Sequence, residues 1–291
     1  MVGKNQLRLG LLAILVFANY LIWVAVSEAS DQNLRIDFLD VGQGDAILLR
    51  TPTGEDILVD GGPDDSVLAE LGKILPIWDR TLDLVVATHT DADHITGLVS
   101  VVKRYQVKEV LTPLPNKSTS ISEAWQQSIV QVPLVNYVDA SDDYQWGEVN
   151  WDTLLPLSSS DALVADTNNI SIVAKLTYEG NSVLLTGDME MSEENLLLQI
   201  YPAVSAEILK VAHHGSKYSS SALFLQAIQP EAVVISVGKN SYGHPSPKTL
   251  NRLEAIGANI YRTDVGGTIE MIFMGKGYSI EANGQKKFYQ N

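Results

Sequence analysis

The sequence predicts a layered α/β domain, and three observations support that fold class. Short apolar runs alternate with segments whose apolar residues recur at helical spacing, as in sheets covered by helices. Several apolar runs end in His or Asp, so polar side chains stand at predicted strand ends. Of the 291 residues, 45% are apolar and 19% are charged, which are ordinary values for a domain with a large core. We therefore expect one folded domain over residues 31–291, preceded by a separate segment, residues 1–30.

The N-terminal segment has the features of a membrane anchor. Residues 9–26 contain no charged side chain, and a helix of this length spans about 27 Å, close to the thickness of a bilayer core. Because Lys4 and Arg8 precede it, we expect a single-pass protein of the cell membrane whose folded domain is extracytoplasmic. The alternative is a signal peptide, with Ala25 and Ser27 as the small residues of its cleavage site, which would leave a secreted protein.

Strands and a helix are predicted in the first half of the domain from apolar patterning. The predicted strands are rich in β-branched residues or leucine and end at Gly, Pro or Asp. They are Leu34–Leu39, Ala46–Arg50, Ile57–Val59 and Leu82–Thr88. A helix is predicted after the last of these, because apolar residues recur at helical spacing from Ile95 to Val102.

The second half shows the same alternation. The predicted strands are Ile170–Tyr178, Ser182–Thr186, Ala206–Val211, Ala232–Val237, Ile260–Arg262 and Thr268–Phe273. The predicted helices are Ser192–Ile200, Ser220–Ile228 and Pro247–Ala255. The last of them has Ser246 as its N-cap and Pro247 at its first position. Each half is therefore expected to form a sheet with helices on one side.

Residues 113–169 are the least regular part of the chain. They contain "PLPNKSTS" and "LSSSDALVADTNN", whose composition is typical of loops. We interpret this segment as an insertion that lies over the active face.

Composition excludes several kinds of site. The chain has no cysteine, so disulfides, thiolate zinc sites and cysteine nucleophiles are excluded. The net charge of −15 argues against tight, non-specific binding to long duplex DNA. One stretch is nevertheless basic and is compatible with short-range binding of DNA, because only Glu231 opposes its five cations. They are Lys210, Lys217, Lys239, Lys248 and Arg252.

The stretch "THTDADHITGL", residues 88–98, gives the strongest chemical signal. His89, Asp91, Asp93 and His94 follow a predicted buried strand with the spacing H-x-D-x-D-H. Four nitrogen or oxygen ligands in six residues exceed what one metal ion takes from one loop, which indicates two adjacent ions. A capping loop with solvated carboxylates is the alternative interpretation.

Two later strand ends carry further candidate ligands. "LLTGDM" places Asp188 after a glycine, so its carboxylate can approach closely and bridge two ions. "LKVAHHGS" ends in His213 and His214. With His244, all five histidines of the chain lie in three such places.

The ordered motifs resemble those of the metallo-β-lactamase-fold hydrolases, and more specifically the nuclease-like C-terminal domain of the ComEC competence proteins. The resemblance covers residues 34–274. Its motifs are "FLDVGQGDAILL" (38–49), "LVDGG" (58–62), "THTDADH", "DTNNISIV" (166–173), "LLTGDM", "LKVAHHGS" (209–216) and "GHPSPKTL" (243–250). The resemblance implies a four-layer αββα sandwich preceded by a single N-terminal hydrophobic helix. Since only one hydrophobic segment is found, we expect a stand-alone hydrolase without the transport channel.

The resemblance also implies roles for the ligands. One metal would be bound by His89 and Asp91, and the other by Asp93 and His94, with Asp188 bridging both. His214, or its neighbour His213, would complete the second metal position. Asn169 stands where many relatives have a histidine. Oxygen ligands at positions 91 and 169 favour manganese or magnesium over zinc and suit a phosphodiester better than a β-lactam.

Other residues are assigned to support and to substrate by the same resemblance. Asp60 and Asp40 would orient ligands by hydrogen bonds, with turn acids as the alternative. Ser216, Lys217 and His244 would contact substrate. His244, together with Asp93, is also assigned to catalysis, because it could donate to a phosphate oxygen or protonate the leaving group. A packed loop histidine is the alternative for His244.

The resulting functional prediction is an extracytoplasmic, dinuclear metal-dependent hydrolase of phosphodiesters, with DNA as the favoured substrate. The expected partners are DNA or another phosphodiester, the membrane through residues 9–26, and a DNA-uptake machinery. Two alternatives stay open. One is a cell-envelope phosphoester esterase with the same metals. The other is a non-catalytic accessory protein of DNA uptake, which Asn169 favours because a weakened metal position could end catalysis.

Overall fold

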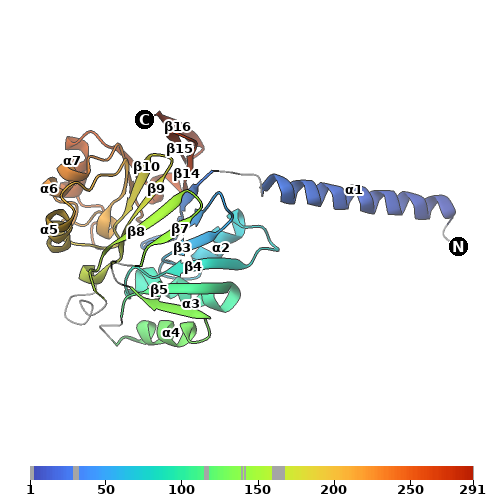
Figure 1. Ribbon diagram of the computed structural model, residues 1–291, viewed down its shortest axis with the longest axis horizontal. Helices are drawn as coiled ribbons and strands as arrows, with labels where there is room; N and C mark the ends of the chain where they lie inside the picture. Colours follow the sequence, from blue (N-terminus) through green and yellow to red (C-terminus); the bar gives the residue numbers. More distant parts are fainter. Residues whose placement is uncertain are drawn as a thin grey trace.

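Two β-sheets packed face to face form the body of the molecule in the computed structural model (Figure 1). The structure describes residues 3–28, 33–114, 118–138, 140, 142–158 and 168–290. The first sheet has the order β16-β15-β14-β1-β2-β3-β4-β5-β6 and the second has the order β13-β12-β11-β10-β9-β8-β7.

The first sheet combines strands from both ends of the chain. Its strands are β1 (Arg35–Phe38), β2 (Ile47–Arg50), β3 (Asp56–Val59), β4 (Thr81–Val86), β5 (Gln106–Thr112), β6 (Leu134–Tyr137), β14 (Ile269–Phe273), β15 (Gly277–Ala282) and β16 (Gln285–Gln290). Strands β3 to β6 are parallel, whereas β14 joins β1 in antiparallel register, with Phe38 opposite Ile269.

The second sheet is built from the later part of the chain. Its strands are β7 (Tyr144–Trp146), β8 (Val149–Leu155), β9 (Val173–Tyr178), β10 (Asn181–Leu185), β11 (Ile208–Lys210), β12 (Ala232–Ile235) and β13 (Asn259–Arg262). Strands β10 to β13 are parallel. Their carboxyl ends therefore share one edge of the sheet, where ligands commonly bind in α/β proteins.

Helices cover the outer face of each sheet. On the first sheet they are α2 (Ser66–Ile74), α3 (Ala92–Arg104) and α4 (Ser120–Ile129), and on the second they are α5 (Met191–Ile200), α6 (Ala222–Ile228) and α7 (Pro247–Ala255). The shorter pieces are η2 (Asn168–Ile170), η3 (Ala212–Gly215) and α8 (Thr263–Gly266). The capping prediction for α7 is confirmed, because the Ser246 side chain accepts from Thr249 N–H and Pro247 begins the helix.

Three hydrophobic clusters separate the four layers. Trp151 and Tyr278 lie in the cluster between the two sheets. Trp125 of α4 packs between the first sheet and its helices, and Leu225 of α6 packs between the second sheet and its helices. Burying a large side chain of this kind typically stabilises a fold by about 2–3 kcal/mol. The layered α/β prediction is thus confirmed as an αββα arrangement.

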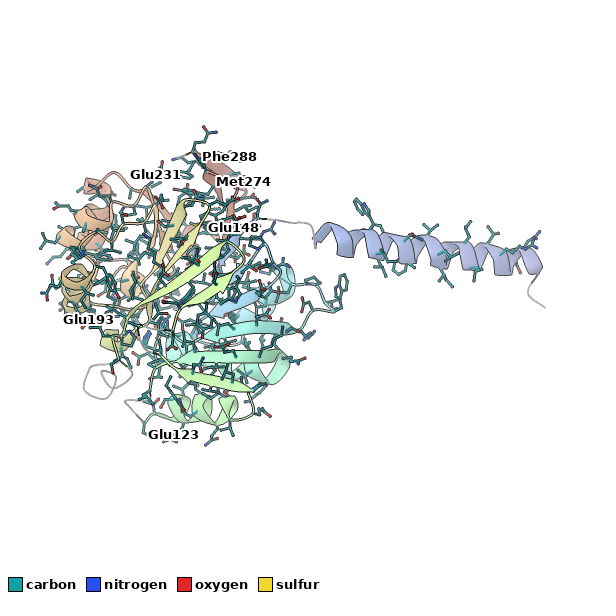
Figure 2. The ribbon with its side chains drawn as sticks, in the orientation of Figure 1. Glu123, Glu148, Glu193, Glu231, Met274 and Phe288 are labelled. Carbon is teal, nitrogen blue, oxygen red and sulfur yellow. The ribbon has the colours of Figure 1, made fainter. Side chains whose placement is uncertain are left out.

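Acidic side chains lie on the outer helices. Figure 2 shows Glu123 of α4 and Glu193 of α5 at the periphery of the body, away from the space between the sheets. On the β14–β16 side, the labelled Met274 and Phe288 are exposed apolar side chains.

The interpretation of residues 113–169 as an insertion is wrong for the described part of that segment. It contributes α4 and β6 to the first sheet layer, and then β7 and β8 to the second sheet. Because β6 and β7 are edge strands of different sheets, the chain passes from one sheet to the other here.

The N-terminal segment forms α1 (Lys4–Glu28), which lies outside the two-sheet body in Figure 1. Apolar side chains of α1 such as Leu12 and Trp23 are exposed. Within the described residues, no helix combines the length and the apolar character needed to cross a membrane. The membrane anchor therefore stays a prediction.

Candidate metal centre

The carboxyl ends of parallel strands from both sheets meet at one place. Asp60 follows β3 and His89 follows β4, both in the first sheet. From the second sheet, Asp188 follows β10, and His213 and His214 follow β11. The centre therefore lies between rigid elements of both sheets and depends on their packing.

The turn after β3 supports helix α3 by very close backbone contact. A Cβ atom added to Gly97 would lie 1.9 Å from the carbonyl oxygen of Gly61, and one added to Gly61 would lie 2.6 Å from the amide nitrogen of Leu98. Only glycine fits at such a distance. The "VDGG" turn and the first turns of α3, which carry Asp93 and His94, are thus held together.

Asp60 orients His94. This fully buried residue adopts a left-handed backbone conformation, with φ of 59°. Its carboxylate accepts hydrogen bonds from Thr88 N–H (2.8 Å), from the Thr88 hydroxyl (2.7 Å) and from His94 Nδ1–H (2.8 Å). Because Nδ1 carries the proton of this hydrogen bond, Nε2 of His94 is the nitrogen that faces the cluster.

His214 is oriented by a backbone carbonyl. Its Nδ1 donates to the carbonyl oxygen of Ser236 (2.9 Å), which follows β12. Both His213 and His214 adopt left-handed conformations, with φ of 51° and 52°, which are costly for residues with side chains. Such strain is common where side chains are held for a function.

Ligand atoms from both halves converge on Asp188. Its Oδ2 lies 3.4 Å from His94 Nε2 and 3.5 Å from His214 Nε2. His214 Nε2 is also 3.4 Å from Asp93 Oδ2. The His89 ring adjoins that of His94, with ring centroids 4.0 Å apart. Four overlapping groups of potential ligands result among the described residues: His89, His94 and Asp188; Asp93, His94 and His214; Asp45, Asp60 and His94; and Asp45, Asp188 and His214.

The residues present fit divalent cations. Several buried ring nitrogens of the cluster have no hydrogen-bond partner among the described residues, which is costly unless a cation or another polar group satisfies them. They are Nε2 of His89, of His94 and of His214. Oδ1 of Asp188 is also buried without such a partner, but it faces Lys210. Imidazole nitrogens and carboxylate oxygens in this number are typical ligands of zinc, manganese and iron.

The buried carboxylates of the centre raise the pKa values of two of its histidines. Burial alone would lower the pKa of His94, but Asp188 and Asp60 raise it well above its usual value. Burial likewise opposes protonation of His214, yet Asp188 and Asp45 raise its pKa to about 10. His89 differs, because burial and the neighbouring His94 lower its pKa to about 3. Binding of cations would therefore displace protons from His94 and His214.

His213 and His244 lie on the open side of the centre. His213 Nε2 is 3.8 Å from Asp188 Oδ2, and its Nδ1 is 3.5 Å from Glu190 Oε1. Its ring meets that of His244 edge to face, with centroids 5.4 Å apart. His213 belongs to none of the four ligand groups described above, whereas His214 belongs to two of them. His214 is therefore the better candidate ligand of the pair.

Asn240 fixes the loop that carries His244. The amide side chain of Asn240 accepts from His244 N–H (3.0 Å) and donates to the His244 carbonyl oxygen (2.8 Å). Nδ1 of His244 is buried and has no hydrogen-bond partner in the described part of the chain. Burial and the charge of His213 lower the pKa of His244, which favours its neutral form.

Asp40 is not where the sequence analysis expected it. Its side chain is exposed, and its carboxylate accepts a long hydrogen bond from Gly42 N–H (3.4 Å). The buried acid of the same motif is Asp45, which lies 3.5 Å from His214 Nδ1. The separation of Asp40 from the cluster arises because the chain turns at Gly42 and Gly44, both with positive φ.

Lys210 also differs from expectation. It was counted among the basic residues available to DNA, but its side chain is buried and pairs with Asp45. Sequence analysis missed Asp45 and assigned Lys210 no site role. The available signal was a lysine inside an apolar strand, since lysine is almost never buried without a partner.

The remaining expected residues occupy varied positions. Asp91 lies near the centre, with Oδ2 3.9 Å from His89 Nε2. Ser216 is buried, and its hydroxyl accepts from Tyr218 N–H within the turn. Lys217 is exposed and lies over the Tyr218 ring. The side chain of Asn169 falls outside the described residues.

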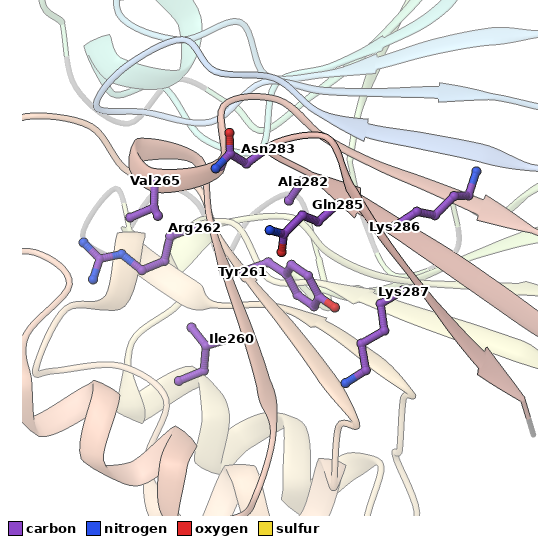
Figure 3. A pocket seen from close by; sticks show the side chains of 10 residues that line it. Ile260, Tyr261, Arg262, Val265, Ala282, Asn283, Gln285, Lys286 and Lys287 are labelled. Carbon is purple, nitrogen blue, oxygen red and sulfur yellow. The ribbon is translucent and has the colours of Figure 1, made fainter.

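A separate hollow of about 380 Å³ lies between β13 and the β15–β16 hairpin (Figure 3). Three cations line it, and each has a polar partner. Arg262 donates to Asp264, Lys287 donates to Asn259, and Lys286 lies 3.9 Å from Glu281. None of the residues that line it belongs to the metal centre, and we assign it no ligand.

Comparison with known proteins places these features in context. Residues 39–239 match the family model of the metallo-beta-lactamase superfamily. The chain is 31% identical over 258 residues to ComE operon protein 3 of Bacillus subtilis, with 81% of this chain and 32% of that protein covered. It is 30% identical over 275 residues to Recombination protein 2 of Haemophilus influenzae, with 92% and 32% covered. The chain thus spans about a third of the length of these relatives.

A solved structure shows the same fold. The metallo-beta-lactamase fold protein YhfI from Bacillus subtilis superposes with a TM-score of 0.53 at 12% sequence identity. The match covers 82% of this chain and 99% of that chain.

Proposed function

Because this chain belongs to the metallo-beta-lactamase superfamily of metal-dependent hydrolases, we propose that it hydrolyses phosphodiesters, with DNA as its substrate. The observation that carries the proposal is the convergence of buried, unpartnered nitrogen and oxygen atoms from both sheets around Asp188. The name of one relative, Recombination protein 2, refers to recombination, which supports a DNA substrate.

The donor set favours a phosphodiester over a β-lactam. Carboxylates of Asp91, Asp93 and Asp188 lie near the histidines and would supply oxygen ligands. Oxygen ligands favour manganese or magnesium, which commonly serve phosphoryl chemistry. When bound, two divalent ions would polarise the phosphoryl group and activate water.

Other residues of the chain orient the candidate ligands or face the substrate side of the centre. Asp60 and the Ser236 carbonyl fix the rings of His94 and His214, so their Nε2 atoms stay directed at Asp188. His213 and His244 face the open side. A neutral His244 ring donates one N–H, which suits a non-bridging phosphate oxygen of the substrate. Its pinned loop would keep that donor in place as the P–O bond to the leaving oxygen breaks.

The acidic surface limits how DNA can bind. The net charge of −15 opposes long-range attraction, so substrate would be held mainly near the centre. With Lys210 buried, the cations left in the basic stretch are Lys217, Lys239, Lys248 and Arg252. A short single strand is therefore the favoured substrate form.

The test separates metal binding from chemistry. The full chain would be assayed with manganese on a short single strand, on RNA, on bis-p-nitrophenyl phosphate and on nitrocefin. Asp188→Ala should lose bound metal and all hydrolysis, and Asp188→Asn should keep weak metal binding with little turnover. His244→Ala should keep its metal and lose about 10²-fold or more in rate.

Glu123→Gln, on the outer helix α4, serves as the control and should match the wild type. Equal metal content and equal trace activity in the wild type and Asp188→Ala would refute the proposal. Hydrolysis of bis-p-nitrophenyl phosphate without cleavage of DNA would instead point to the cell-envelope phosphoester alternative.

A further inference from the structure

A buried lysine lies beneath the metal centre. The Lys210 side chain is 1% exposed, and its Nζ contacts Asp45 Oδ2 and donates to the Gly187 carbonyl oxygen at 2.9 Å. Nζ is also 3.7 Å from Oδ1 of Asp188. A buried cation thus stands directly beside Asp188, the carboxylate on which the candidate ligands converge.

The two oxygens of Asp188 face different neighbours. Oδ2 faces the Nε2 atoms of His94 and His214, at 3.4 and 3.5 Å. Oδ1 faces Lys210, is buried and has no hydrogen-bond partner among the described residues. A movement of the ammonium by roughly 1 Å would bring it to hydrogen-bond distance of Oδ1. An ion pair of that kind would compete with a metal ion for the same carboxylate.

Asp45 is placed to prevent this movement. Its side chain is buried, and its Oδ2 holds the Lys210 ammonium. Its Oδ1 lies on the Nδ1 side of His214, at 3.5 Å, and so behind the ring, away from the Nε2 atom directed at Asp188. Asp45 lies within reach of an ion shared with Asp188 and His214, but its Oδ1 adjoins the Nδ1 of His214 that donates to Ser236, and its Oδ2 is held by Lys210.

We propose that Asp45 is a positioning residue that holds the buried Lys210 ammonium away from Asp188 and thereby keeps this carboxylate available to metal. The inference rests on metal binding at the centre, which is part of the proposed function, and it is independent of the substrate. It assigns a role to two residues, Asp45 and Lys210, that the sequence analysis did not place in the metal centre.

The proposal is tested by asking whether removal of Lys210 restores the metal affinity lost in Asp45→Asn. Manganese affinity of the full chain would be measured by calorimetric titration for the wild type, Asp45→Asn and the double variant Asp45→Asn/Lys210→Met. Asp45→Asn should bind manganese about 10–100-fold more weakly, since Lys210 then pairs with Asp188. Removing the lysine as well should restore the affinity to within about threefold of the wild type.

A control separates this effect from the loss of any buried ion pair. Asp56 is 5% exposed and pairs with Arg50 at the amino end of β3, at the opposite end of the strand from the centre. Asp56→Asn removes a buried ion pair remote from the centre and should leave manganese affinity unchanged. A purely structural role of Asp45 would predict the same pattern for Asp45→Asn.

Each outcome decides the question. Equal manganese affinity in the wild type and Asp45→Asn overturns the inference alone, as does a double variant that stays as weak as Asp45→Asn. A wild type that binds no divalent metal overturns the proposed function and this inference together. If Asp45→Asn does not fold, Lys210→Met replaces it: the proposal expects affinity within about threefold of wild type, and a tenfold loss contradicts it.

Discussion

Replacing Asp60 by asparagine tests whether its carboxylate orients the His94 ring for metal binding. Asparagine has nearly the same size and tolerates the left-handed φ of 59° at this position, so the backbone should be little disturbed. The change removes the charge of an acceptor that now takes three hydrogen bonds. An amide has one oxygen and one NH2 group, so it cannot accept on both sides.

The hydrogen bond to His94 is the one most affected. With the amide oxygen on Thr88 N–H, the NH2 group faces His94 Nδ1 and favours the ring tautomer whose proton lies on Nε2. That proton would point at Asp188, where a metal ion requires a lone pair. Loss of an outer hydrogen bond of this kind typically costs about 10–100-fold in metal affinity, or about 1.4–2.7 kcal/mol. An unpaired buried donor should also lower the free energy of unfolding by about 1–3 kcal/mol.

Two measurements check this expectation. Calorimetric titration with manganese gives the affinity, and urea unfolding in the presence of a chelator gives the stability of the metal-free protein. Affinity within threefold of the wild type would refute the assigned role of Asp60, even if stability fell. Lower stability with full affinity would mean that Asp60 only completes the hydrogen bonds of the turn.

Three further predictions concern the metal, a buried acid and the N-terminal segment. Manganese or magnesium should support faster hydrolysis than zinc at equal occupancy, and faster turnover with zinc would contradict the role given to the oxygen ligands. Burial, followed by the charge of Glu270 opposite on β14, raises the pKa of Asp37 to about 7. The folded protein therefore binds this proton more tightly than the unfolded chain does, and stability should fall as the pH rises from about 4 to 7, by up to about 4 kcal/mol. Asp37→Asn should remove that part of the dependence, and equal slopes of urea midpoint against pH in both proteins would contradict it. If residues 9–26 anchor the chain, the protein should fractionate with membranes and protease added to intact cells should remove the folded domain, whereas a mature N-terminus near Glu28 would indicate a cleaved signal peptide.

Patterns that repeat along the chain could be predicted from the sequence. Each predicted strand overlaps an observed one, because a strand buried on both faces is a continuous apolar run, as in Ala232–Ile235. The helix cap at Ser246 was predicted, and the helix predicted from Ser220 begins after its N-cap Ser221. Such starts can be predicted because a cap is set by residues within one turn.

Two missed elements had local signals. The β15–β16 hairpin turns at Asn283 and Gly284, which have φ of 51° and 69°, and Asn-Gly is the strongest short-range hairpin signal. Helix α4 begins with a capping box between Thr119 and Ser122. These elements were missed because the surrounding sequence is polar, and their buried residues, such as Trp125, are few.

The candidate metal ligands could be predicted better than the residues that hold them in place. The candidate ligands stand in short motifs at strand ends, and the structure brings His89, Asp93, His94, Asp188 and His214 together. The partners of those ligands could not be found in this way. Asp45 and Lys210 are 165 positions apart, and no local pattern shows that two residues from different sheets will form an ion pair.

The pairing of β1 with β14 has a consequence for synthesis on the ribosome. Strand β1 lies in the interior of the first sheet, and one of its two neighbours is separated from it by more than 200 residues. Until β14 has left the exit tunnel, the edge of β1 displays unpaired N–H and C=O groups that can add a strand from another nascent chain. The protein therefore cannot complete its first sheet during translation of the first half, and its yield in cells should depend on chaperones that shield this edge until the last strands arrive.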